Sequence, residues 1–206
     1  ILAAFEHPEL GRKITERMID QVLADCRAWI SAGIDFGHVA VNVPGVELHD
    51  RAFPDRLLAR LAHADVEPRR IELEVTESLI MQNAERSLRQ MAELEAMGFS
   101  WAIDDFGTGY SSLAYLTRFR ASTLKIDRAF INNIPGDHHH NMVVKTILAM
   151  AKSLDMLTIA EGVETAEQAA YLLQLGCARA QGYHFGKPVP ADEFAERWLK
   201  PLAVKS

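Results

Sequence analysis

The sequence holds little cysteine and no long apolar run, and each shortage excludes a class of protein. The two cysteines, Cys26 and Cys177, have neither metal-binding nor redox spacing, so we expect reduced thiols in a cytosolic protein rather than a disulfide framework. No apolar run approaches the roughly 20 residues of a membrane-spanning helix. The chain begins Ile1-Leu-Ala-Ala, without an initiator Met, a basic leader or a cleavage site, so we expect it to be part of a longer protein.

Positive charge is also scarce. The formal net charge is -6 and the sequence pI is near 5.8. An acidic chain without a basic stripe disfavours binding to DNA or RNA. The remaining composition is that of an ordinary globular protein, with 49% hydrophobic and 24% charged residues, and there is no linker, internal repeat or low-complexity tract. We therefore expect residues 1–206 to form one domain.

Short apolar or alternating runs predict strands, and helix-period segments lie between most of them. The predicted strands are His38–Val43, Arg70–Thr76, Ser100–Phe106, Thr123–Asp127, Leu157–Glu161 and Arg179–Phe185. Thr165 and Gln168 form a capping box before one of the predicted helices. The run His138–His140 precedes another helix and is expected to be a solvated loop rather than a metal site.

Alternating strands and helices predict a parallel sheet covered by helices, either as a closed (β/α) barrel or as an open doubly wound sheet. No glycine-rich phosphate-binding fingerprint follows the first strand, which disfavours the nucleotide-binding open sheet. A (β/α) barrel needs eight strands and typically about 250 residues. We therefore expect an α/β barrel that is incomplete at its N-terminus, with about two strands upstream of Ile1.

Polar side chains stand at or just after the carboxyl end of each predicted strand. They are Asn42, Glu74, Glu77, Asp104, Asp105, Lys125, Asp127, Glu161, Glu164 and Gln181. Any one of them is ordinarily a turn former, a helix cap or an ion-pair partner. In a barrel, however, these strand ends meet at one mouth, so their recurrence on successive strands indicates a shared site.

The chemistry of these residues favours a hard metal. Alternation along Ile71–Thr76 turns Glu72 and Glu74 toward the barrel axis, where carboxylates are costly unless they are paired or bound to a cation. Oxygen donors without cysteine or histidine favour Mg2+ or Mn2+ over zinc. Lys125 could orient a water molecule for attack on a phosphate, and Glu161 could take a proton from it.

Short motifs cover nearly the whole chain in a fixed order. They are Val41-Asn-Val43, Glu72-Leu-Glu-Val-Thr-Glu-Ser78, Asp104-Asp-Phe-Gly-Thr-Gly-Tyr-Ser-Ser-Leu113, Thr123-Leu-Lys-Ile-Asp-Arg128, Ala160-Glu-Gly-Val-Glu-Thr165 and Ala180-Gln-Gly-Tyr183. In this order they resemble the motifs of the EAL domain family of cyclic di-GMP phosphodiesterases. The resemblance implies a modified TIM-type (β/α) barrel with one antiparallel strand. It also implies hydrolysis of cyclic di-GMP to the linear dinucleotide pGpG with Mg2+ or Mn2+.

The resemblance further implies a role for each matching residue. The implied ligands of two metal ions are Asn42, Glu74, Asp104 and Asp105. The implied catalytic residues are Lys125, Glu161 and Asp127. The implied substrate-binding residues are Gln181 and Gly182. Glu77 would brace the loop that contains Gly107 and Gly109, which in the family links the metal site to a dimer interface.

One family feature is missing from the sequence. The Glu-Ala-Leu signature, whose glutamate is a metal ligand in the family, belongs upstream of Ile1, so we expect this chain alone to bind metal poorly. The resemblance also implies a homodimer, an upstream sensor or GGDEF domain, and a cytoplasmic domain whose full protein could be tethered to a membrane.

Two other functions stay open from the sequence. One is a catalytically inactive cyclic di-GMP receptor on the same fold, although such receptors commonly lose the aspartate pair or the glycine-rich loop, and both are present here. The other is a different metal-dependent barrel enzyme, such as an aldolase or an enolase-like lyase. That alternative uses the same oxygen ligands but does not predict the Asp105-Phe-Gly-Thr-Gly109 loop.

Overall fold

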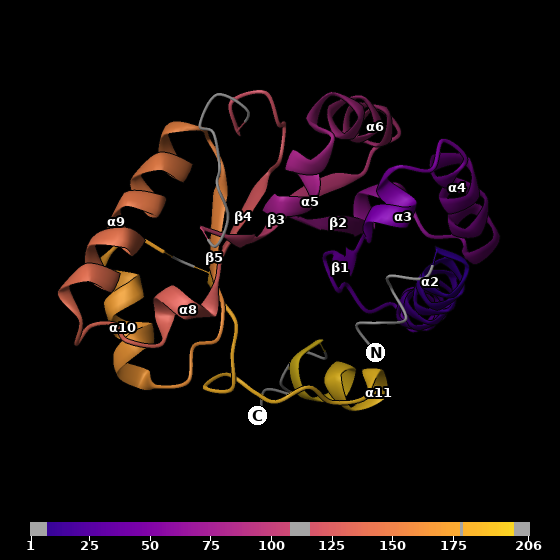
Figure 1. Cartoon of the computed structure of the whole chain (residues 1–206). Helices are drawn as coiled ribbons and strands as arrows, with labels where there is room; N and C mark the ends of the chain where they lie inside the picture. The colour runs from indigo at the N-terminus through magenta and orange to yellow at the C-terminus, as the bar shows by residue number, and fades with distance from the viewer. Residues whose placement is uncertain (1–7, 108–115, 178, 200–206) are drawn as a thin grey trace, which may run out of the picture.

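The computed structural model describes residues 8–107, 116–177 and 179–199. Parallel strands form one curled sheet with helices around its outside (Figure 1). The strands are β1 (Val39–Asn42), β2 (Ile71–Thr76), β3 (Ser100–Phe106), β4 (Thr123–Ile126), β5 (Leu157–Ala160) and β6 (Arg179–Ala180). Each strand pairs in parallel with the next one along the chain, so all the carboxyl ends lie at the same rim.

The helices follow the strands in the alternating order that the sequence predicts. They are α2 (Pro8–Ser31), α3 (Gly45–Leu48), α4 (Phe53–Ala64), α5 (Glu77–Gln82), α6 (Ala84–Ala96), α8 (Arg128–Ile131), α9 (His138–Ser153), α10 (Ala166–Gln174) and α11 (Ala191–Phe194). The last of them continues as a π-helical turn over Ala195–Leu199. Among the described helices, none has the length and apolar character needed to cross a membrane.

The hydrophobic core lies between the outer face of the sheet and the helices. Leu73 of β2, Ile103 of β3 and Leu124 of β4 have no exposed surface. Leu94 of α6 and Val144 of α9 are equally buried in the same cluster. Because side chains alternate along a strand, the residues between these apolar ones turn inward, as predicted for Glu72 and Glu74.

The strand register brings inward-facing residues of neighbouring strands side by side. Asn42 of β1 is the direct partner of Glu74 on β2, and Thr76 of β2 is the partner of Asp104 on β3. The inner face therefore carries a polar row near the carboxyl rim, whereas the outer face is apolar.

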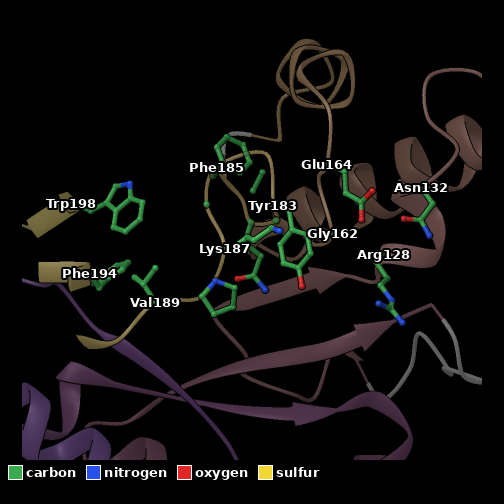
Figure 2. A pocket seen from close by; sticks show the side chains of 15 residues that line it. Arg128, Asn132, Gly162, Glu164, Tyr183, Phe185, Lys187, Val189, Phe194 and Trp198 are labelled. Atoms are coloured by element: carbon green, nitrogen blue, oxygen red, sulfur yellow. The ribbon is translucent and has the colours of Figure 1, made fainter. Parts of the chain in front are cut away.

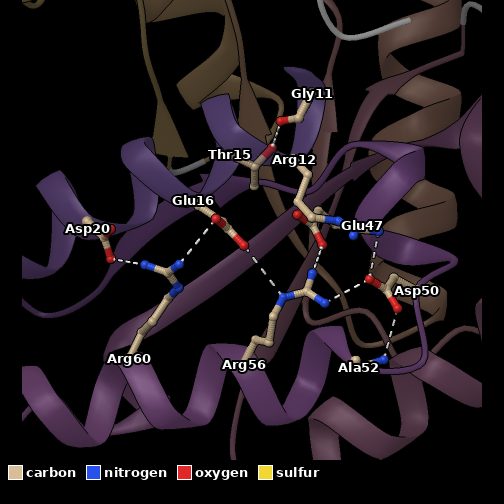
Figure 3. Close-up of polar contacts among 10 residues, drawn as sticks. All are labelled: Gly11, Arg12, Thr15, Glu16, Asp20, Glu47, Asp50, Ala52, Arg56 and Arg60. Atoms are coloured by element: carbon tan, nitrogen blue, oxygen red, sulfur yellow. Dashed lines mark hydrogen bonds and ion pairs between the residues drawn. The ribbon is translucent and has the colours of Figure 1, made fainter. Parts of the chain in front are cut away.

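A network of ion pairs fixes the segment after β1 against the outer helices (Figure 3). Arg56 of α4 contacts Glu47 of α3, Asp50 and Glu16 of α2. The Glu47 side chain is 1% exposed, and burial raises its pKa despite the opposing charge of Arg56. This network anchors α3, which directly follows the strand that ends in Asn42.

Several local predictions from the sequence were wrong. The predicted strand Arg179–Phe185 ends at Ala180, because the chain then turns at Gly182 and the Phe185 N–H donates to the Gly182 carbonyl at 3.0 Å. The histidines 138–140 form the first turn of α9 instead of a loop. Asp137 caps that helix by accepting a hydrogen bond from the His140 N–H at 3.0 Å.

The predicted capping box and the free thiols are confirmed. The Thr165 hydroxyl accepts from the Gln168 N–H at 3.2 Å, and the Gln168 amide oxygen accepts from the Thr165 N–H at 3.1 Å. The Gln168 amide nitrogen also donates to the Ile131 carbonyl at 3.0 Å, which ties α10 to α8. Cys26 and Cys177 are buried and form no disulfide.

The Thr165→Ala substitution is expected to lower the free energy of unfolding by about 1 kcal/mol, because the N-terminus of α10 loses its cap. Thr146→Ala is the matched control, since the Thr146 hydroxyl only bonds back to the Met142 carbonyl within α9. Urea unfolding followed by circular dichroism measures both variants. Equal destabilisation by the two substitutions would contradict a special role for the cap.

Candidate functional site

A buried lysine and three carboxylates meet at the carboxyl rim of the sheet. The Lys125 ammonium lies 2.8 Å from Glu74 Oε1, 3.0 Å from Asp104 Oδ1 and 2.8 Å from Glu161 Oε1. The Lys125 side chain is only 5% exposed. The residues come from β2, β3, β4 and the position after β5, so the parallel sheet itself brings them together. One positive charge faces three negative ones.

A β-bulge places two adjacent aspartates at this site. The pairing between β3 and β4 shifts register between Ile103 and Phe106, and Asp105 adopts a left-handed backbone with φ of 53°. Neighbouring side chains on a regular strand point to opposite faces, and the bulge removes that restriction. Carboxylate oxygens of Asp104, Asp105 and Glu161 consequently lie within 4.8 Å of one another. The left-handed backbone costs on the order of 1 kcal/mol, which the surrounding sheet must sustain.

The electrostatics of the site favour a bound cation. Burial raises the pKa of both Glu74 and Glu161, although Lys125 opposes the rise. Burial also raises the pKa of Asp105, and the nearby charges of Asp104 and Asp127 add to it. Burial alone lowers the pKa of Lys125, but hydrogen bonds to Glu161 and Glu74 outweigh it and the net shift is upward. The carboxylates therefore gain from a proton or a metal ion.

The donor set fits a hard divalent cation. Asp104, Asp105 and Glu161 offer carboxylate oxygens, and Glu74 lies on the same side of the sheet. Asn42 is solvent-exposed and sits opposite Glu74 in the register, so its amide oxygen belongs to the same inner face. Oxygen ligands of this kind select Mg2+, Mn2+ or Ca2+ over zinc.

Asp127 and Gln181 border the carboxylates. The Asp127 carboxylate accepts from the Ala129 N–H at 2.8 Å, so this residue caps α8 rather than ending β4, which corrects the predicted strand Thr123–Asp127. Its charge also acts on Asp105. The Gln181 amide nitrogen donates to Glu161 Oε1 at 2.6 Å, the same oxygen that faces Lys125.

Gly182 has a structural reason to be glycine. Its backbone lies so close to Val163 that an added Cβ would come within 2.2 Å of the Val163 carbonyl oxygen. The tight approach lets Gln181 and Gly182 turn beside Glu161. The structure therefore assigns Gly182 a packing role at the rim of the site, and its predicted contact with substrate stays a prediction.

Glu77 braces the beginning of the loop after β3. It is the first residue of α5, is 4% exposed, and accepts from the Gly107 N–H at 3.0 Å. Gly107 has φ of 96°, and a Cβ there would lie 2.7 Å from the Phe130 ring. The structure thus brings Glu77 and Gly107 together, whereas Gly109 falls outside the described residues.

A cavity of about 760 Å³ adjoins the site through Gln181, which lines it and donates to Glu161 (Figure 2). None of Glu74, Asp104, Asp105 and Glu161 lines this cavity. Gln181, Gly182, Gly162 and Glu164 form its edge nearest Glu161. Several other residues that line the cavity were not predicted from the sequence to have a function, and they include Arg128, Asn132, Tyr183, Phe185, Lys187 and Trp198. Arg128 and Tyr183 are the last residues of two of the family-like motifs, so their presence in a site could have been predicted from the sequence. No sequence pattern indicated a role for Trp198.

The sequence of this chain matches one known protein family. The sequence profile of the EAL domain matches residues 1–188. The chain belongs to the EAL domain family. The barrel class and the family predicted from the motifs are thereby confirmed.

This EAL domain is similar to proteins named as cyclic di-GMP enzymes. It is 40% identical over 181 residues to the bifunctional diguanylate cyclase/cyclic di-GMP phosphodiesterase MucR of Pseudomonas aeruginosa, covering 88% of this chain and 26% of MucR. It is 39% identical over 183 residues to the probable cyclic di-GMP phosphodiesterase PdeN of Escherichia coli, covering 89% of this chain and 34% of PdeN. The chain therefore spans about a quarter to a third of these two relatives.

Solved structures share the fold. The PaMucR phosphodiesterase in complex with c-di-GMP superimposes with a TM-score of 0.90 at 39% identity, covering 94% of this chain and 78% of that one. Klebsiella pneumoniae BlrP1 in a manganese and c-di-GMP complex gives a TM-score of 0.79 at 27% identity, covering 88% of this chain and 46% of that one. The curled parallel sheet of this EAL domain is thus the TIM-like barrel of its family.

Replacing Lys125 by methionine is expected to lower the stability of the metal-free protein by about 3 kcal/mol, because the buried Glu74 and the partly buried Asp104 and Glu161 lose their counter-charge. Adding Mn2+ should raise the melting temperature of Lys125→Met more than that of the wild type, since the ion replaces the missing charge. Differential scanning calorimetry with and without Mn2+ measures both effects. Lys145→Met, an exposed position on α9, is the control. A variant as stable as this control would refute the charge-balance argument.

Proposed function

We propose that this EAL domain hydrolyses one phosphodiester bond of cyclic di-GMP to give linear pGpG, and that the reaction requires Mg2+ or Mn2+. The main support for this proposal is that carboxylate oxygens of Asp104, Asp105 and Glu161 lie within 4.8 Å of one another, beside the buried Lys125. Relatives named as cyclic di-GMP phosphodiesterases support the substrate. The adjoining cavity supplies room for a dinucleotide.

Asn42, Glu74, Asp104 and Asp105 would hold two divalent cations. When bound, the ions supply Lewis-acid polarisation of the phosphate and lower the pKa of water. Glu74 is buried, and Asp104 and Asp105 are only partly exposed on the inner face of the sheet, so their charge is less screened than that of a surface carboxylate and attracts divalent ions.

Lys125 and Glu161 would handle the charge and the proton. The Lys125 ammonium is fixed by contacts at 2.8–3.0 Å to three carboxylates and so presents its charge at one defined point, where it can orient water or stabilise phosphoryl oxygens. Burial raises the pKa of Glu161, which makes it a better acceptor for the proton of an attacking water. Gln181 holds the Glu161 carboxylate in place through its 2.6 Å hydrogen bond, and Asp127 completes the acidic edge beside Asp105.

The cavity would bind the nucleotide portion of the substrate. Tyr183 is 62% exposed and Phe185 is 51% exposed, so both rings offer surface on which a purine can stack, with Lys187 lying over one face of Tyr183. In the sequence, Gln181 and Gly182 lie between Glu161 and these two rings. Both residues line the same cavity. A guanine base in the cavity would therefore leave its attached phosphate near Glu161.

We also propose that residues 1–206 act as one module of a longer cytoplasmic signalling protein. MucR, of which this chain spans 26%, is named as both a diguanylate cyclase and a phosphodiesterase, which supports an upstream GGDEF or sensor domain here. A homodimer is part of the same proposal. Size-exclusion chromatography with light scattering on the full-length protein tests it.

Asp104→Ala is expected to reduce turnover of cyclic di-GMP by more than about 100-fold. Loss of a residue that only supports a metal ligand costs up to about 100-fold, and loss of a ligand itself should cost more. Calorimetric titration with Mn2+ should show weaker or fewer bound ions. Asp55→Ala, at an exposed position on α4, is the control and should behave like the wild type. Full activity of Asp104→Ala would rule out the two-ion scheme, and tight binding of cyclic di-GMP without turnover by the wild type would favour a receptor.

Removal of divalent ions with EDTA is expected to abolish hydrolysis, because the acidic site then repels the two phosphate charges of the substrate. Re-addition of Mg2+ or Mn2+ should restore it, whereas Zn2+ should not, since the donors are all oxygen. Product formation is followed by chromatography of pGpG. Undiminished turnover in EDTA would refute a metal-dependent mechanism.

A further inference from the structure

The positive charge of Lys125 at the catalytic rim is offset by carboxylates of the protein itself. Lys125 contacts three carboxylates and is 5% exposed, so its charge is balanced within the protein. Cyclic di-GMP carries two phosphodiesters, of which one is cleaved at the carboxylates under the proposed function. The other keeps its negative charge throughout the reaction. A cation on the wall of the adjoining cavity, away from the carboxylates, could balance that remaining charge.

Arg128 is a cation on the wall of the adjoining cavity. Its side chain is exposed and makes no ion pair or hydrogen bond with any residue in the described ranges. Figure 2 shows Arg128 on the same side of the cavity as Asn132 and Glu164, opposite Phe194 and Trp198. The guanidinium is thus open to a ligand, and Glu164 is the carboxylate that shares the wall with it.

The backbone of Arg128 is fixed close to the reacting centre. Arg128 is the first residue of α8 and follows Asp127, which caps that helix. Gly162, the residue after Glu161, packs against it so closely that an added Cβ would lie 2.5 Å from the Arg128 Cβ. Arg128 is therefore adjacent in space to the segment that carries Glu161 and adjacent in sequence to Asp127.

Resting on the function proposed above, we propose that Arg128 binds the phosphate of cyclic di-GMP that is not cleaved. A guanidinium presents paired N–H donors that match two phosphate oxygens, and such charge-assisted bonds are stronger than neutral ones. The other described cation on the cavity wall, Lys187, lies 5.5 Å from the centre of the Tyr183 ring and is engaged there. Arg128 would thereby select a cyclic dinucleotide over a diester with a single phosphate.

Substitution of Arg128 by methionine tests the assignment by binding. Calorimetric titration of cyclic di-GMP into purified protein in Ca2+, with chromatography to check for product, should show binding weakened roughly 10- to 100-fold, the loss expected for a charged hydrogen-bonded contact. Arg128→Lys keeps the charge without the paired donors and should lose less. Arg89→Met removes an exposed arginine of α6 and should bind within about twofold of the wild type.

Selectivity gives a second readout. With Mn2+, the ratio of kcat/KM for cyclic di-GMP to kcat/KM for bis(p-nitrophenyl) phosphate, which has one phosphate, should fall at least about tenfold in Arg128→Met, mainly through KM for the dinucleotide. Equal losses on both substrates, or binding of cyclic di-GMP like that of Arg89→Met, would overturn the assignment. If the wild type binds cyclic di-GMP without hydrolysing it, the phosphodiesterase proposal fails while the binding comparison still decides the role of Arg128. Absence of binding by the wild type would overturn both.

Discussion

Mutual repulsion among buried carboxylates is the constraint on which the rest of this site depends. Glu74, Asp104 and Glu161 all lie within 3.0 Å of a single ammonium group, that of Lys125. Burial penalises their charged forms, and one lysine cannot neutralise them together with Asp105. A proton or a metal ion would relieve this electrostatic cost, which is the physical basis for the proposed metal dependence.

The fold sustains this repulsion by fixing the backbone around it. Parallel strands deliver one acidic or basic side chain each to a common rim, and the bulge in β3 turns Asp105 to the side of Asp104. Glu77 holds the Gly107 N–H just beyond the bulge, and Gly182 packs on the Val163 backbone on the other side of the site. Each device is a close backbone contact that a larger or differently shaped residue would open.

Much of this fold could be predicted because its signals are local. The alternation of Ile71–Thr76 correctly assigned one face to the core and one to the inside of the barrel, and the capping box at Thr165 marked the start of α10. The predicted strand Arg179–Phe185 was too long because its apolar pattern continues past Ala180, whereas close packing of Gly182 turns the chain there. The loop prediction for histidines 138–140 was wrong because Asp137 caps the helix ahead of them, so they form the first turn of α9.

The order of residues was enough to show that oxygen donors recur at strand ends, because residue type and the two-residue period of a strand are properties of the chain alone. It therefore determined the barrel class and the hard-metal chemistry expected of it. Three-dimensional packing was needed to show that Lys125 bridges three carboxylates, that Asp105 leaves the regular alternation, and that Arg128 stands on the wall of the neighbouring cavity. These distances depend on sheet curl, register and backbone packing between segments far apart in sequence, which no local pattern records.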